Sequence, residues 1–316
     1  MSKAIIESEV EQVALDILKE IGYKIIYGPD IAPDGEKSER ASYSDVVLVD
    51  RLKDAIDKLN HKLPPEAKEE ALKKIIRSES QNIITNNHHF HKMLVEGVDV
   101  EYKHDGRIKG DKVWLFDFDN PKNNEFLAVN QFTIIENNYN RRPDILLFIN
   151  GLPLIAIELK NPADENATVK TAYNQFQTYK SEIPSLFNYN EILILSDGID
   201  ARAGTLTSEW ERFLPWKTID GMSKAPTKIP QIEVLIKGMF DKSILLDLLR
   251  HFIVFEQEKD SEKNIIKVSK KIAAYHQYHA VNKAVEATTK ASSSKGDRRC
   301  GVVWHTQGSG KSLSMA

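Results

Sequence analysis

The sequence is poor in the features that mark secreted, membrane-spanning or strongly basic proteins. Its 316 residues include one cysteine, Cys300, which excludes an internal disulfide framework and fits a reducing cytosol. No apolar run reaches the length of a membrane span, and the amino-terminal residues lack the apolar core of a signal peptide. The formal net charge is −3, so the basic excess that autonomous nucleic-acid binding usually needs is missing. If the ligand is DNA, we expect most of the affinity to come from other domains or subunits.

The composition is that of an ordinary globular protein. Hydrophobic residues make up 41% and charged residues 28% of the chain, which allows a sizeable core. The length fits about two domains. Residues 217–231 are rich in proline, lysine and glycine, and we place the domain boundary there. We predict a first domain over residues 1–225, and over 226–316 a helical linker followed by the start of a second domain.

Hydrophobic periodicity predicts a mixed α/β fold. The first helix has its apolar residues between Val10 and Ile21 at helical spacing and ends at Gly22. Further helices are predicted at about 49–60, 65–77, 86–96, 168–181, 243–255 and 267–290, and strands at 23–27, 98–103, 112–118, 126–135, 191–196 and 301–304.

Two features have no assigned role at this point. The loop at 36–45 has a sequence too specific for a spacer, but no mechanism follows from it. His88, His89 and His91 cluster in one predicted helix. Because no cysteine or further histidine stands at structural-zinc spacing, a solvated helix face is more expected than a metal site.

A predicted β-hairpin organises the middle of the chain. Two apolar runs, 144–149 and 154–159, flank Asn150-Gly151, and Asn-Gly between such runs is the strongest short-range hairpin signal. The runs are unbroken rather than alternating. Both faces of the two strands are therefore expected to be covered.

Three charged residues, Asp144, Glu158 and Lys160, stand at the open end of this hairpin. Glu158 and Lys160 are two apart, so they share one face of the strand while Leu159 points to the other. Two carboxylates on one face suit a hard cation such as Mg²⁺, and a neighbouring ammonium can orient a water and stabilise charge developing on a phosphate. From spacing alone, a structural aspartate beside a solvated strand end is an equal alternative.

The hairpin register separates these alternatives. A strict two-residue Asn-Gly turn pairs Asp144 with Ile157, which puts Glu158 on the opposite face. One extra residue pairs Asp144 with Glu158 and lets them share a metal ion. The metal hypothesis therefore predicts a bulge or an odd-length loop between Phe148 and Leu154.

Pro143-Asp144, followed on the next strand by Glu158-Leu159-Lys160, resembles the PD-(D/E)xK nuclease signature. The resemblance implies that the two carboxylates bind Mg²⁺ together with the carbonyl of Leu159. It also implies that Lys160 assists the attacking water.

The same resemblance implies two further contributions to the site. A first-helix glutamate often points into the site of such nucleases, and Glu11 holds the similar place, with Glu7 as second choice. Solvation at the surface is the default for either residue. Gln175 and Tyr179 lie four apart, on one helix face, and resemble a feature of the RecB-like nuclease branch. We expect them to face the site, with an ordinary amphipathic helix end as the alternative.

The end of the sequence contains a phosphate loop (Walker A motif). Gly308 and Gly310 let backbone N–H groups turn onto phosphate oxygens, Lys311 meets the β- and γ-phosphates, and Ser312 can hold Mg²⁺. His305 stands where the usual motif has its first glycine, which is typical of superfamily-two helicases and translocases.

Gln277 resembles the helicase glutamine that reads adenine, to which it can offer one donor and one acceptor. A RecB-like nuclease core before such a phosphate loop is similar to the restriction (R) subunit of type I restriction–modification enzymes, over essentially the whole chain. This resemblance implies a PD-(D/E)xK core, with a mixed sheet flanked by helices. It implies next the beginning of a RecA-like motor domain, truncated after the Walker A loop.

The family resemblance also implies an activity and partners. Such a subunit is a cytoplasmic, Mg²⁺-dependent endonuclease that joins modification and specificity subunits, moves DNA using ATP and cuts both strands. Another subunit recognises the DNA sequence. One alternative is a DNA-repair or junction nuclease, in which the phosphate loop is not expected. The other is a motor or assembly subunit with a non-catalytic nuclease-like scaffold, against which the intact Asp144, Glu158 and Lys160 set argues.

The phosphate loop leads to a prediction about ATP. Hydrolysis by such a motor also needs an acidic residue on a later strand and an arginine from a second lobe. Asp164 and Glu165 precede the loop and cannot serve. We expect the purified chain neither to hydrolyse ATP nor to translocate, and to bind nucleotide weakly if at all. Steady-state phosphate release with DNA present measures this, and turnover that is lost in Lys311→Ala would contradict it.

Overall fold

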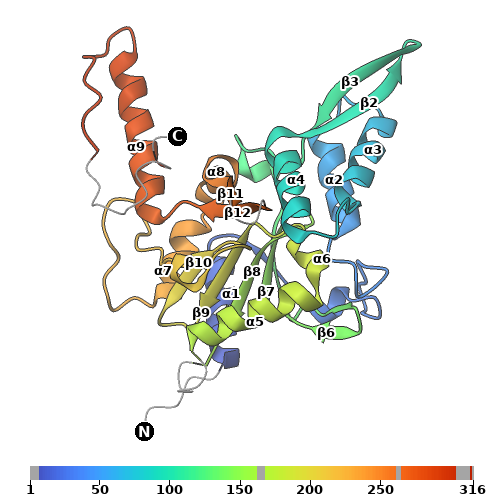
Figure 1. The fold of residues 1–316 in the computed structure, drawn as a ribbon, viewed down its shortest axis with the longest axis horizontal. Coiled ribbons are helices and arrows are strands. Elements are labelled where there is room, and N and C mark those ends of the chain that lie inside the picture. The colour runs from blue at the N-terminus through green and yellow to red at the C-terminus, as the bar shows by residue number, and fades with distance from the viewer. Residues whose placement is uncertain (1–6, 162–167, 261–264, 304–313, 315–316) are drawn as a thin grey trace.

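The computed structural model describes residues 7–161, 168–260, 265–303 and 314. They form a mixed α/β structure around a six-stranded sheet with the strand order β1-β4-β7-β8-β9-β10 (Figure 1). The predicted mixed sheet flanked by helices is confirmed. Its strands are β1 (Lys24–Tyr27), β4 (Phe126–Asn130), β7 (Ile145–Ile149), β8 (Leu152–Leu159), β9 (Ile192–Ser196) and β10 (Ala201–Gly204).

The strand directions create one end of the sheet at which several strands finish together. β1 pairs with β4 and β8 with β9 in parallel, whereas β7 is antiparallel to both β4 and β8. β4, β8 and β9 therefore run in the same direction, and their last residues lie at the same end of the sheet as the first residue of β7. We call this the C-terminal end of the sheet.

Helices cover both faces of the sheet. The helices α1 (Glu7–Glu20) and α7 (Gln231–Met239) pack together on one face, and α5 (Val169–Glu182) and α6 (Pro184–Phe187) lie on the other (Figure 1). Every residue of β7, β8 and β9 is buried, as the unbroken apolar runs predict.

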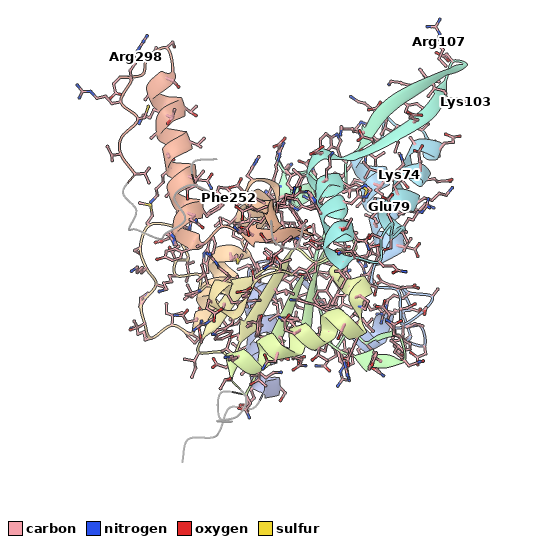
Figure 2. The ribbon with its side chains drawn as sticks, viewed as in Figure 1. Lys74, Glu79, Lys103, Arg107, Phe252 and Arg298 are labelled. Atoms are coloured by element: carbon pink, nitrogen blue, oxygen red, sulfur yellow. The ribbon has the colours of Figure 1, made fainter. Side chains whose placement is uncertain are left out.

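A second group of elements extends beyond the sheet. The hairpin of β2 (Val98–His104) and β3 (Arg107–Val113) projects as an arm whose tip carries Lys103 and Arg107 (Figures 1 and 2). The helix α9 (Tyr275–Ser292) projects on the other side, with Arg298 beyond its end (Figures 1 and 2). The base of the arm is formed by the helices α2 (Val49–Leu59), α3 (Pro65–Ile76) and α4 (Ile83–Glu96). Elsewhere in the structure lie the short strands β5 (Ile134–Glu136) and β6 (Tyr139–Arg141) and the 3₁₀ turns at Gly28–Ile31, Pro121–Asn123 and Trp210–Arg212. The helices predicted at about 49–60, 65–77 and 86–96 and the strand at 98–103 are confirmed, within a few residues at their ends. The strand predicted at 112–118 is wrong over most of its length, because β3 begins at Arg107, directly after the turn from β2, and residues 114–118 form no strand.

The predicted helix at 267–290 is wrong over its first residues. After α8 (Lys242–His251) the chain forms an antiparallel hairpin of β11 (Ile253–Asp260) and β12 (Ile265–Ile272), and only then α9 (Tyr275–Ser292). β-branched residues such as Val254 and Val268 favour strands, provided that each has a partner strand to pair with. The expected helical linker therefore contains a β-hairpin.

The segment before the phosphate loop also differs from the prediction. Residues 301–303 form no strand, and the side chain of Val302 is 91% exposed. The rest of the predicted strand, Trp304, lies outside the described residues. Within the part of the chain that the structure describes, none of the helices is long and apolar enough to cross a membrane.

The predicted division between residues 225 and 226 falls in the irregular stretch before α7. Residues on both sides of it share one hydrophobic core, because α7 packs on α1. The hydroxyl of Tyr23 also donates a hydrogen bond of 3.1 Å to the carbonyl of Phe240. The division into two domains stays a prediction.

The Asn150-Gly151 turn joins β7 to β8 as predicted. Both residues have positive φ angles, of 51° and 82°, which the two central residues of a type I′ turn require. The side-chain oxygen of Asn150 accepts from the N–H of Glu125 at 2.8 Å, and its amide donates to the carbonyl of Leu115 at 2.9 Å. The carbonyl of Gly151 accepts from the N–H of Leu48 at 2.9 Å, so the turn is fixed on both sides.

A pair of glycine substitutions measures how tightly this turn is packed. Gly106, in the β2–β3 turn, has a φ of 76° and open space around an added Cβ, so Gly106→Ala is expected to cost about 1 kcal/mol of backbone strain. An added Cβ at Gly151 lies 2.4 Å from the carbonyl oxygen of Leu48, so Gly151→Ala is expected to cost several kcal/mol. Urea unfolding of the two variants gives both values, and equal losses would disprove the packing argument.

Candidate active site

The β7–β8 hairpin contains a one-residue bulge. Near the turn, Phe148 pairs with Pro153. The next pair along β7 is Leu147 with Ile155, which leaves Leu154 as the extra residue. The turn itself is therefore the strict two-residue type, and the bulge that follows it supplies the predicted shift in register.

This shift places Asp144 opposite Glu158. Ile145 pairs with Ile157, and the same register continued by one residue brings the two acidic residues together. The Oδ2 atom of Asp144 accepts a hydrogen bond of 2.7 Å from the N–H of Leu159. The Asp144 carboxylate therefore reaches across to β8 at the C-terminal end of the sheet.

Glu158 and Lys160 form a buried ion pair at the same place. The Nζ atom of Lys160 lies 2.9 Å from Oε1 of Glu158, and the two residues are 8% and 1% exposed. The backbone N–H of Lys160 donates to the carbonyl of Ser196 on β9, at 2.8 Å. Removing either member would leave a buried charge without its counter-charge, which is strongly destabilising. The two side chains are therefore expected to stay paired in the folded protein.

Tyr179 and Gln175 face this end of the sheet from α5. Burial raises the pKa of the Tyr179 hydroxyl, and the negative charge of Glu158 raises it further. A hydrogen bond of 2.6 Å from the Gln175 amide acts in the opposite direction, and Asp144 again raises the pKa. The hydroxyl therefore lies within the electrostatic reach of both carboxylates.

Glu11 is held by two amide side chains at the C-terminal end of β4, one from its last residue, Asn130, and one from the next residue, Gln131. The amide of Asn130 donates to one carboxylate oxygen at 2.7 Å, and the amide of Gln131 donates to the other at 2.8 Å. The backbone N–H of Gln131 donates to the carbonyl of Asp144 at 3.1 Å. The sequence analysis gave Asn130 and Gln131 no role. Their place at the end of a buried strand, where polar residues often take part in a site, was the signal that could have identified them. The side chain of Glu7 lies outside the described part of the structure.

The loop at 36–45 supports the turn that carries Gln131. Arg40 is 4% exposed, and its guanidinium lies 3.7 Å from the ring centre of Phe132. One of its nitrogens donates to the carbonyl of Thr133 at 3.0 Å and to that of Asp45 at 3.2 Å. Through Arg40, this loop packs against the segment that follows Gln131.

The donor set fits a cation that keeps water ligands. Among the described residues, no group of three or more His, Cys, Asp or Glu side chains is arranged to hold a metal ion. Asp144 and Glu158 would therefore supply two carboxylates, with a main-chain oxygen and water as the remaining ligands. Mg²⁺ is commonly bound through one or two carboxylates in this way. Glu11, which accepts hydrogen bonds from the amides of Asn130 and Gln131, is placed to orient the turn at Gln131.

The three helical histidines diverge from one another. His89 pairs with Glu79 at 3.0 Å, whereas His88 and His91 contact the ring of Phe255 on β11. These contacts dock the β11–β12 hairpin on α4.

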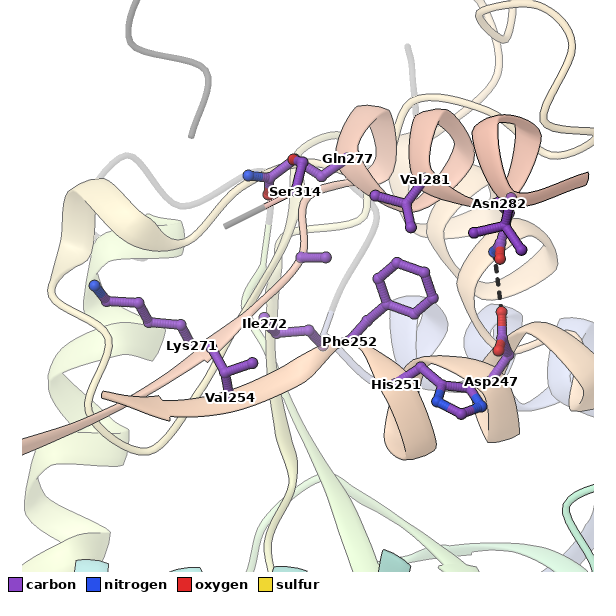
Figure 3. A pocket seen from close by; sticks show the side chains of 12 residues that line it. Asp247, His251, Phe252, Val254, Lys271, Ile272, Gln277, Val281, Asn282 and Ser314 are labelled. Atoms are coloured by element: carbon purple, nitrogen blue, oxygen red, sulfur yellow. Dashed lines mark hydrogen bonds between the residues drawn. The ribbon is translucent and has the colours of Figure 1, made fainter. Parts of the chain in front are cut away.

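Gln277 lies in the first turn of α9, where its side-chain oxygen accepts from the N–H of Ala274 at 2.8 Å. It lines a cavity of about 470 Å³ together with Phe252, Ile272 and Ser314. Figure 3 shows Gln277 and Ser314 at one end of this cavity. The phosphate-loop residues Gly308, Gly310, Lys311 and Ser312 lie outside the described residues.

Comparison with known families matches two parts of the chain. Residues 5–212 match the model of the type I restriction enzyme R protein N terminus. Residues 276–316 match the model of the SWI2/SNF2 ATPase. The first match contains all the residues of the candidate site, and the second contains Gln277 and the phosphate loop.

Curated relatives agree with the first match. The type I restriction enzyme HindI endonuclease subunit of Haemophilus influenzae is 45% identical over 312 residues, which are 98% of this chain and 29% of that protein. The provisionally named type I restriction enzyme MjaIXP endonuclease subunit of Methanocaldococcus jannaschii is 35% identical over 97% of this chain and 30% of its own length. The chain thus spans less than a third of these relatives.

Two substitutions of Asp144 separate its charge from its hydrogen bond. Asp144→Asn keeps an acceptor for the N–H of Leu159 and removes one negative charge beside Glu158, so the variant is expected to be at least as stable as the wild type without divalent ions. Asp144→Ala leaves that N–H without its acceptor, which is expected to cost about 1–3 kcal/mol. Thermal unfolding in EDTA compares them, and a less stable Asn variant would show that the carboxylates do not repel each other.

Proposed function

Because the chain belongs to the family of type I restriction enzyme R proteins, of which it is the N-terminal part, we propose that it is the Mg²⁺-dependent endonuclease domain of a type I restriction enzyme. The observation that carries the proposal is the bulge at Leu154, which brings Asp144 opposite Glu158. In this register Asp144 lies opposite Glu158, whose carboxylate is 2.9 Å from the ammonium of Lys160.

In the proposed site, Asp144, Glu158 and the carbonyl of Leu159 would hold Mg²⁺. When bound, the ion neutralises charge on the phosphodiester and makes its phosphorus more open to attack. Lys160 orients the attacking water and stabilises the negative charge that develops on the phosphate oxygens. The ion pair with Glu158 keeps that ammonium at the metal side of the strand.

The proposed reaction is hydrolysis of a phosphodiester in double-stranded DNA. The oxygen of water forms a bond to phosphorus, one phosphorus–oxygen ester bond breaks, and the leaving oxygen takes up a proton. From α5, Gln175 and Tyr179 would contact the DNA backbone or the groups that hold the ion. Glu11 orients the turn beside Asp144 through Asn130 and Gln131.

The complete subunit is proposed to act in the cytoplasm with modification and specificity subunits, and to cut after ATP-driven translocation. The similarity of residues 276–316 to SWI2/SNF2 ATPases supports the motor part of this proposal. The cavity at Gln277 is then proposed to take the adenine of ATP. A formal net charge of −3 agrees with DNA being held mainly by the other parts of the complex.

Cleavage of plasmid DNA tests the proposal. The subunit that carries this sequence is combined with modification and specificity subunits, Mg²⁺ and ATP. We expect Asp144→Asn, Glu158→Gln and Lys160→Ala each to reduce cutting at least about a hundredfold, because each removes a group that acts on the transition state.

Lys24→Ala is the matched control, because Lys24 is an exposed lysine on β1 of the same sheet. It is expected to cut at the wild-type rate, and all variants are expected to hydrolyse ATP normally. Wild-type cutting by any of the three site variants would reject the assignment of that residue.

A further inference from the structure

We propose that Lys270, on the β11–β12 hairpin, is a positioning residue for the nuclease site. It holds the segment that fixes the bulge on which the Asp144–Glu158 register depends. The functional part of this inference rests on the proposed nuclease activity, whereas the structural part can be tested without DNA.

Lys270 is a buried ammonium whose hydrogen bonds are all used. The residue is 1% exposed, and its Nζ atom lies 2.5 Å from Oε2 of Glu191. It also donates to Oδ1 of Asn87 at 2.8 Å and to the carbonyl of Asn190 at 3.0 Å. An ammonium has three N–H groups, so each has an acceptor here. The side chain thereby joins the hairpin to α4 and to the start of β9.

The segment held by Lys270 is the one that contacts the bulge. The backbone N–H of Glu191 donates to the carbonyl of Leu154 at 2.6 Å, and the side-chain amide of Asn190 donates to the same oxygen at 3.2 Å. Leu154 is the extra residue of β8, and its carbonyl receives both of these bonds from the segment before β9. A buried carbonyl without such donors would be costly, so these contacts stabilise the bulged register over the regular one.

The backbone of Lys270 is fixed as firmly as its side chain. Its N–H donates to Oγ1 of Thr207 at 2.7 Å, and its carbonyl accepts from Oγ1 of Thr205 at 2.6 Å. His91 approaches Glu191 from α4, with 3.0 Å between Nδ1 and Oε2. The ammonium therefore acts as a rigid link between the hairpin and Glu191.

The position of the β11–β12 hairpin in the chain suggests what the contact between Lys270 and Glu191 does. The hairpin directly precedes α9, which leads into the phosphate-loop segment. A shift of the hairpin would withdraw Lys270 from Glu191 and Asn190 and so weaken the support of Leu154. Because a one-residue slip moves a strand side chain to the other face, the carboxylates would then no longer face each other. The nuclease site is thus complete only while the hairpin is docked.

Amide hydrogen exchange of the 316-residue chain, followed by NMR, tests the link. In Lys270→Met we expect the amides of Glu191 and Leu159 to exchange at least about tenfold faster, because their acceptors Leu154 and Asp144 depend on the bulge. The amide of Ile56, in α2, serves as a distant reference and is expected to keep its rate.

Lys271→Met is the matched control. Lys271 is the next residue on the same strand, its side chain is 34% exposed, and it pairs with Glu256 of β11. Its substitution is expected to leave all of these exchange rates at their wild-type values. Uniformly faster exchange of every core amide in Lys270→Met, Ile56 included, would show a general structural role and overturn the proposal, as would unchanged exchange at Leu159.

A second variant covers the case in which Lys270→Met does not fold. Lys270→Met combined with Glu191→Gln removes both buried charges together, which is far less destabilising than leaving one of them alone. This double variant still lacks the bonds from the ammonium to Asn87 and Asn190, so faster exchange at Leu159 is again expected. Wild-type exchange at Leu159 in the folded double variant would overturn the proposal.

The assembled enzyme supplies the functional readout. With partner subunits, Lys270→Met is expected to hydrolyse ATP normally but to need about ten times more Mg²⁺ for half-maximal cutting. A loss of this size is typical when a residue that supports a metal ligand, without binding the metal itself, is removed. An unchanged Mg²⁺ requirement would show that Lys270 does not position the nuclease site. If the wild type itself does not cut, the nuclease assignment fails, and the exchange rates still decide the role of Lys270 in the register.

Discussion

The extra residue at Leu154 is the constraint on which the candidate site depends. Side chains alternate between the two faces of a strand, so a shift of one residue exchanges the faces completely. The two-residue turn at Asn150-Gly151 alone would set Asp144 against Ile157. With the bulge, Asp144 lies opposite Glu158, and its carboxylate accepts a hydrogen bond from the N–H of Leu159. A single main-chain irregularity thus brings together two acidic residues that the turn alone would leave on opposite faces of the sheet.

Two buried ion pairs mark the opposite ends of β8 and β9. Glu158 and Lys160 pair at the C-terminal end of the sheet, and Glu191 pairs with Lys270 where β9 begins. Breaking a buried pair by removing one partner costs roughly 3–5 kcal/mol, although an intact pair adds little net stability. Each pair therefore holds its two residues in one arrangement. The strands between these fixed points are entirely buried, so a change at one end is not absorbed by a flexible segment.

Much of the fold was predictable because the local signals agreed with the final structure. The helices between residues 49 and 96, the strand at 191–196 and the Asn-Gly hairpin follow from periodicity and turn residues. The β11–β12 hairpin was missed because β12 reads as the start of α9 until its partner strand is known. The strand predicted at 126–135 is broken at Gln131, whose φ of 56° turns the chain toward Glu11. No propensity scale predicts such a left-handed residue, because long-range hydrogen bonds hold it in place.

The sequence by itself determined which residues carry charge at the end of the hairpin, that Glu158 and Lys160 share a face, and that both strands are buried. Those properties depend only on residue type and on the period of a strand. Tertiary structure alone decided that Asp144 joins them, since the register depends on donors from Asn190 and Glu191. It also decided which groups hold Glu11, because one of them is an amide 119 positions away in the chain. Contacts of that length leave no periodic trace in the sequence, because each depends on the folding of everything between its two ends.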